Sequence, residues 1–181
     1  MATLAFREQT AMGMGYIGPM YEVLAYVYET FWGGEDCPGR DQLGRRLCSA
    51  GFEREEIQAA LAWLDGLNTA AQSLAESPIE LVDLTVAEAP RTHSLRVYTP
   101  RELTHLGPQG LACLHFLEQA GALPLELREL VIDRALAVSE SPLELDELKV
   151  IVMMVYWRTG VEPDVLIVDE LCGSSTNRLA H

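Results

Sequence analysis

Apolar side chains recur at intervals of three and four residues along most of the chain, which predicts a mainly helical protein. The first helix is expected to begin at Met20 and to end at Phe31, before two glycines. Two shorter amphipathic helices are expected at 41–50 and 54–67, with a tight turn at Gly51–Phe52 between them. This order of elements predicts a helix-turn-helix.

Residues at the ends of the two short helices support these boundaries. Asp41 is expected to cap the first helix, and Gly51 suits the left-handed position that follows its last turn. Phe52 and Ile57 have the spacing of a hydrophobic staple around Glu53, at the start of the second helix. The second helix is expected to bury Ile57, Ala60, Leu61 and Leu64, and to expose Glu55, Gln58, Ala59, Ala62 and Asp65.

The pattern changes after the second short helix. Residues 68–78 are mostly small, which predicts a linker. Strands are expected at 79–86 and 94–98, because apolar and polar residues alternate in the second of these segments. A loop at 88–91 would join them as a hairpin. Residues 20–99 therefore have the order of a winged-helix domain.

The rest of the patterned chain is again helical. Thr99, Pro100 and Glu102 form a strong helix start, with a capping threonine, a proline in the first turn and a glutamate that reaches back. The segment 150–157 is apolar on every side, so its helix is expected to be central and enclosed by its neighbours. The helices expected after the first one in this half span 108–120, 124–138, 143–157 and 161–172.

The fold class predicted from these elements is mainly α, with a winged-helix-like N-terminal half, including a small β-hairpin, packed on a C-terminal helical bundle. The expected divisions are a flexible N-terminal extension at 1–19, a winged-helix-like domain at 20–99, a helical domain at 100–172 and a disordered tail at 173–181. Since the expected linker lies inside the first half, a core shared by both halves is the alternative to two separate domains.

Composition narrows the classes of function. The net charge is −14, and Lys149 is the only lysine among thirteen basic residues. Such a charge repels nucleic-acid phosphates unless a local basic patch compensates. The four cysteines are scattered and no signal peptide precedes them, so we expect reduced thiols in a cytoplasmic protein. The longest apolar run, 150–157, is too short to cross a bilayer, so no membrane partner is expected.

Nucleic-acid recognition by the helix-turn-helix is one candidate function. It would use cations beside the second helix for phosphates and Gln58 for a base edge. Against it, the exposed face of that helix contains two carboxylates and one plausible base contact. The candidate nucleic-acid-binding residues are Arg40, Arg45, Arg46, Arg54 and Gln58 in the helix-turn-helix, with Arg91 and Arg96 on the wing.

Candidate catalytic or metal-binding groups are sparse. Cys113 and His115 are two residues apart on an expected helix, so they point to different sides rather than to one metal ion. The sequence contains no nucleophile elbow, phosphate-binding loop or dinucleotide fingerprint. We therefore expect no enzyme activity, no cofactor and no metal.

Several phrases of the sequence, in this order, resemble the Smg family, a bacterial group without an assigned activity. The resemblance covers roughly residues 20 to 172. It implies a cytoplasmic protein, and it implies no cofactor and no catalytic residues. The phrases are MYEVLAYVYETF, GFEREEIQAALAWLDGL, LRVYTPREL, FLEQAGAL, RELVIDRAL and LELDELKVIVMMVYW.

The leading hypothesis from the sequence is a non-enzymatic interaction or regulatory module that binds a protein partner in the bacterial cytoplasm. It rests on a helix-turn-helix whose exposed face is acidic. A DNA- or RNA-binding regulator is the alternative. No sequence feature sets the oligomeric state or identifies the partner.

Overall fold

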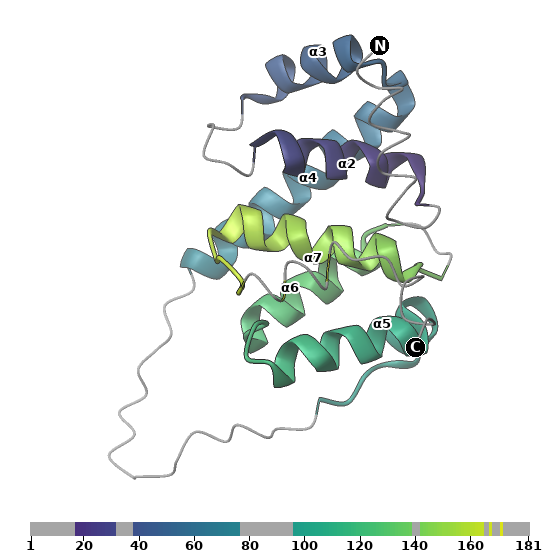
Figure 1. Cartoon of the computed structure of the whole chain (residues 1–181), viewed down its shortest axis with the longest axis vertical. Coiled ribbons are helices and arrows are strands. Elements are labelled where there is room, and N and C mark those ends of the chain that lie inside the picture. The colour runs from purple at the N-terminus through teal and green to yellow at the C-terminus, as the bar shows by residue number, and fades with distance from the viewer. Residues whose placement is uncertain are drawn as a thin grey trace, which may run out of the picture.

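Helices make up all the regular structure that the computed structural model describes, which comprises residues 17–31, 38–76, 96–138 and 142–164 with Ile167 and Leu171. The mainly α class is thus confirmed. The helices are α2 (Pro19–Phe31), α3 (Arg40–Ala50), α4 (Arg54–Glu76), α5 (Pro100–Gln119), α6 (Leu125–Leu136) and α7 (Leu145–Thr159) (Figure 1).

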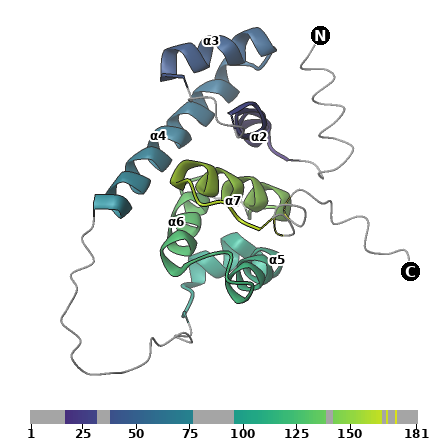
Figure 2. The same cartoon turned by 60° about the vertical axis from the view of Figure 1, so that its left-hand side comes forward.

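Helix α7 occupies the centre of the molecule. All its residues from Leu148 to Tyr156 are buried, and it packs against α2, α4, α5 and α6 (Figure 2). An unbroken apolar sequence predicts this position, because a helix that is apolar on every side must be covered on every side. The buried apolar residues of these six described helices form one hydrophobic core.

Helix α4 links α2 and α3, which pack on its first half, to α6 and α7. It continues to Glu76, so the linker expected at 68–78 is wrong over its described part. Small residues such as alanine are strong helix formers, and Leu67 and Ala71 extend the buried stripe of the helix by another turn. Residues 77 and 78 lie outside the described part.

Most predicted helix ends are confirmed. Gly51 follows α3 with a φ of 96°, and the Glu53 N–H donates to the Glu56 carboxylate at 3.0 Å at the start of α4. Thr99 and Glu102 form the expected capping box of α5. The cap of α3 was predicted wrongly: the helix begins at Arg40, after Gly39, and Asp41 instead lies in the first turn. A carboxylate there still stabilises the helix through its dipole.

The predicted β-hairpin is wrong. The described residues contain no strand, and Arg96–Tyr98, the described end of the second predicted strand, has no regular secondary structure. Val97 is 88% exposed, whereas Arg96 and Tyr98 are partly buried. The alternation therefore reflects an extended segment that turns its polar residues inward. The first predicted strand at 79–86 and the loop at 88–91 lie outside the described residues.

The C-terminal helices differ from expectation in detail. The predicted boundary at residue 108 is a kink within α5, where Gly107 adopts a φ of 61°. Residues 161–164 are not helical, and most of the rest of the helix expected at 161–172 lies outside the described part. At the other end, Ile17 is buried and the Gly18 N–H donates to Glu147 Oε1 at 3.0 Å, which anchors the start of α2 on α7.

Candidate functional site

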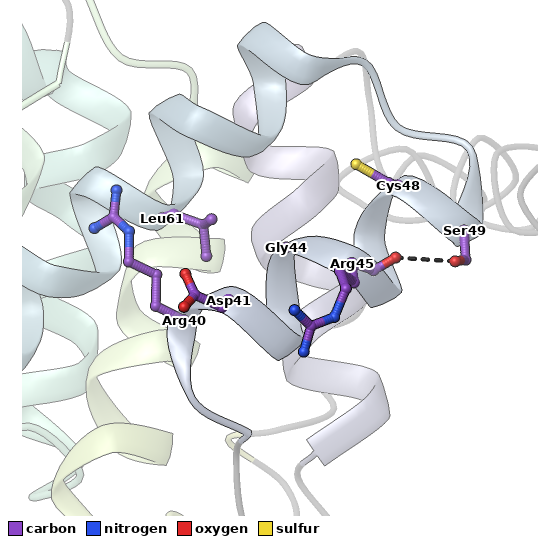
Figure 3. A pocket seen from close by; sticks show the side chains of 7 residues that line it. All are labelled: Arg40, Asp41, Gly44, Arg45, Cys48, Ser49 and Leu61. Carbon is purple, nitrogen blue, oxygen red and sulfur yellow. Dashed lines mark hydrogen bonds between the residues drawn. The ribbon is translucent and has the colours of Figure 1, made fainter.

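An open hollow of about 630 Å³ lies on the surface of α3 where this helix packs on α4 (Figure 3). Leu61 comes from α4, and the other lining residues come from one face of α3, where residues three and four apart lie together. The lining of this α3–α4 hollow is Arg40, Asp41, Gly44, Arg45, Cys48, Ser49 and Leu61.

The packing of α3 explains why this face is open. Leu43 and Leu47 turn toward the core, so the opposite side of α3 is left to solvent. Gly44 has no side chain there, and a Cβ atom at this position would lie 3.6 Å from Leu61 Cδ1. The floor of the hollow is therefore apolar, and charged side chains surround it.

The charges around the hollow are mixed. Arg40 forms an ion pair with Asp65 of α4, so its charge is already neutralised. Figure 3 shows the Asp41 carboxylate between the side chains of Arg40 and Arg45 in this view. Cys48 is exposed and carries a free thiol, and the Ser49 hydroxyl donates to the Arg45 carbonyl at 2.9 Å.

The structure brings five of the residues predicted to bind nucleic acid onto α3 and the beginning of α4. Arg40, Arg45, Arg46, Arg54 and Gln58 are all exposed, and the Arg46 guanidinium lies 5.7 Å from the centre of the Phe31 ring. The face of α4 predicted to be exposed is confirmed. It consists of Glu55, Gln58, Ala59, Ala62 and Asp65.

The two remaining predicted residues do not join this surface. Arg91 lies outside the described residues. Arg96 lies in the segment 96–99 that leads into α5, and α5 lies at the opposite end of the molecule from α3 (Figures 1 and 2). Its guanidinium donates to both carboxylate oxygens of Glu102 at 2.9 and 3.1 Å and to both of Glu129 at 2.7 Å. These bonds leave it little capacity for a phosphate.

Arg96 belongs to an ion cluster that the sequence analysis did not identify. Arg128, which is buried, forms ion pairs with Glu118 and Glu129 in the same cluster. The hydrogen bonds from Arg96 hold the pKa of Glu102 at about 2, and they also lower the pKa of Glu129. The members come from three separate segments, so their spacing in the sequence carries no signal. We call Arg96, Glu102, Glu118, Arg128 and Glu129 the α5–α6 ion cluster.

No set of three histidine, cysteine or acidic side chains in the described part of the chain is placed to hold a metal ion. Burial raises the pKa of the Cys113 thiol, which opposes thiolate formation. His105 is buried, with Nε2 3.0 Å from the Ala135 carbonyl oxygen, so it has a structural partner.

None of the helices that the structure describes combines the length and the apolar character needed to cross a bilayer.

Comparison with known proteins places the chain in a family. Residues 20–181 match the family described as protein of unknown function (DUF494). A Protein Smg homolog from Methylibium petroleiphilum is 46% identical over 162 residues, or 90% of this chain and 100% of that protein. The corresponding homolog from Leptothrix cholodnii is 47% identical over the same shares, and that from Bordetella pertussis is 42% identical. No solved structure matches the chain. The chain therefore belongs to the Smg family, whose function is unknown.

Proposed function

We propose that this protein is a non-enzymatic interaction or regulatory module of the bacterial cytoplasm, and that it binds a protein partner through the α3–α4 hollow. One observation carries the proposal: positive and negative side chains alternate around an open hollow with an apolar floor. Protein interfaces have this composition, with an apolar centre inside a polar rim.

A nucleic-acid backbone suits this surface poorly. Phosphates form a continuous line of negative charge, so a binding site needs a run of cations without carboxylates between them. Here Asp41 lies among the arginines of α3, and Asp65 already neutralises Arg40. Glu55 also lies on the exposed face of α4. A partner with discrete charges can avoid these carboxylates, whereas a phosphate backbone cannot.

The exposed thiol of Cys48 allows a direct test in the cell lysate. The other three cysteines are replaced by alanine, Cys48 is coupled to a photo-crosslinker, and the labelled protein is irradiated in native lysate with and without nuclease. We expect a crosslinked protein whose yield is unchanged by nuclease. A matched control has Cys48→Ala together with Ala112→Cys, which moves the crosslinker to an exposed position on α5, and should not capture that protein.

Two results would overturn the proposal. Capture that disappears after nuclease treatment would indicate a nucleic-acid partner that recruits proteins indirectly. Equal capture from Cys48 and from position 112 would show that the hollow has no part in binding.

A further inference from the structure

We propose that the occupant of the α3–α4 hollow is an acidic amphipathic helix of the partner protein. This inference rests on the proposed function and adds the chemical class of the partner. Three properties of the described residues support it: the charge of α3, the arginines without ion pairs or hydrogen bonds to other residues, and the apolar floor of the hollow.

Helix α3 differs in charge from the other described helices. It contains three arginines and one acidic residue in a chain whose net charge is −14. Helices α2, α4, α5 and α6 each contain more acidic than basic residues, and α7 contains equal numbers. An acidic partner would therefore be repelled by most of this molecule and attracted to α3, which favours binding at one place.

Part of the positive charge on α3 and at the start of α4 has no carboxylate partner within the described part of the molecule. Among the described residues, the guanidinium groups of Arg45, Arg46 and Arg54 make no ion pair or hydrogen bond to another residue, and that of Arg46 lies 5.7 Å from the centre of the Phe31 ring. The other described cations do have such partners. Ion pairs to carboxylates involve Arg40, Arg96, Arg128, Arg134 and Lys149, and hydrogen bonds involve Arg101 with the Leu136 carbonyl and Arg158 with Asn68.

The residues around the hollow suit a helix with separated carboxylates. Asp41 and Arg45 lie one turn apart on α3, about 5–6 Å from each other, so a partner helix can place a glutamate toward Arg45 and a neutral residue toward Asp41. Apolar side chains of the same helix would cover Leu61 and the Gly44 backbone at the floor. Helix-in-groove binding uses this combination of an apolar stripe and flanking charges.

The test uses a designed amphipathic peptide of about 18 residues as the probe, long enough for several helical turns. Leucines form its apolar stripe and glutamates flank the stripe, and a matched peptide has glutamine in place of every glutamate. Fluorescence anisotropy measures both peptides against the full chain. We expect the glutamate peptide to bind about tenfold more tightly than the glutamine peptide, and the difference to shrink as salt rises.

Variants of the protein locate the binding. The double variant Arg45→Glu with Arg54→Glu should bind the glutamate peptide about tenfold more weakly than the wild type does. The same variant should bind a lysine version of the peptide more tightly than the wild type does. Gly44→Leu should weaken the binding of both original peptides, because the leucine side chain fills the hollow. The helix should tolerate this change, because leucine favours the helical state more than glycine does. Arg101→Glu, an exposed change on α5, should leave all peptides unchanged.

The outcomes separate this inference from the proposed function. No binding, equal binding of the glutamate and glutamine peptides, or binding that survives Arg45→Glu with Arg54→Glu would overturn the acidic-helix inference. Nuclease-resistant capture through Cys48 would still support a protein partner in that case. Loss of the Cys48 capture after nuclease treatment would overturn the proposed function itself, whatever the peptides do.

Discussion

Replacing Glu102 by glutamine should destabilise the protein by about 2 kcal/mol at neutral pH. The Glu102 side chain is 10% exposed and accepts two hydrogen bonds from Arg96. It also accepts the Thr99 N–H at 2.7 Å as part of the α5 capping box. Glutamine keeps the size and the carbonyl oxygen needed for the cap, but its amide nitrogen replaces the Oε1 atom that accepts from Arg96, so the substitution removes the charge and one hydrogen bond.

The magnitude follows from the pKa of this carboxyl. The hydrogen bonds from Arg96 lower the pKa of Glu102 from its ordinary value of 4.5 to about 2. Each pKa unit corresponds to about 1.4 kcal/mol, so the full shift corresponds to about 3 kcal/mol. Solvent screens the partly exposed Arg96, and Glu129 remains as its partner in the variant, so we expect about 2 kcal/mol.

The same pKa shift sets the pH dependence of the stabilisation that Glu102 provides. Since the folded-state pKa lies below the unfolded-state pKa, the stabilisation is fully present above about pH 5 and is lost as the pH falls toward 2. The difference in unfolding free energy between wild type and Glu102→Gln should therefore shrink over that interval.

Urea denaturation followed by circular dichroism at several pH values measures this difference. Thermal unfolding at pH 7 should show a decrease in Tm of roughly 4–8 °C for a chain of this length. Glu129→Gln is the matched control, because Glu129 also pairs with Arg96 but its side chain is 49% exposed, and it should cost less than about 1 kcal/mol. Equal costs for the two substitutions, or a difference that does not change with pH, would refute the reasoning.

Three further predictions concern the fold. Gly51→Ala should cost about 1 kcal/mol in urea denaturation, because the φ of 96° at this position strains an alanine, whereas Gly39→Ala should be nearly neutral. Met154→Ala should cost about 2–5 kcal/mol by the same measurement, because Met154 is fully buried in α7. Burial raises the pKa of Tyr156 to about 12, and its hydroxyl donates to the Ala122 carbonyl at 3.0 Å. The unfolded chain therefore ionises first above pH 10, and the stability of the wild type relative to Tyr156→Phe should fall between pH 10 and 12.

Much of the helical structure could be predicted because its causes are local. The capping box at Thr99 and Glu102 and the left-handed glycine at Gly51 depend on residues within a few positions of each other. The central place of α7 follows from its composition alone. The C-terminal extension of α4 was missed because small residues are common in both linkers and helices, and only the burial of Leu67 and Ala71 distinguishes the two.

The predicted hairpin shows where local patterns are insufficient. Alternation at 94–98 is compatible with a strand or with any extended segment, and the partner of that segment decides between them. Here Arg96 is held by carboxylates from α5 and α6, which are 6 and 33 residues away in the sequence. No local rule connects these positions.

For the candidate site, the sequence identified the arginines of α3 and the exposed face of α4, since helical periodicity determines which residues share a face. It did not identify the hollow, which depends on how Leu61 of α4 packs beneath Gly44 of α3.

The mainly helical class, most helix ends and the central helix follow from the sequence, because propensity, capping and apolar periodicity act over a few residues, and the order of several sequence phrases indicates the family. The pairing of charged side chains follows instead from the packing of the helices. The sequence does not distinguish Arg40 and Arg96 from Arg45 and Arg54, but in the fold the first two are paired with carboxylates, whereas the other two form no ion pair among the described residues. Ion pairing depends on distances of a few ångströms between elements, and those distances exist only after the helices have packed.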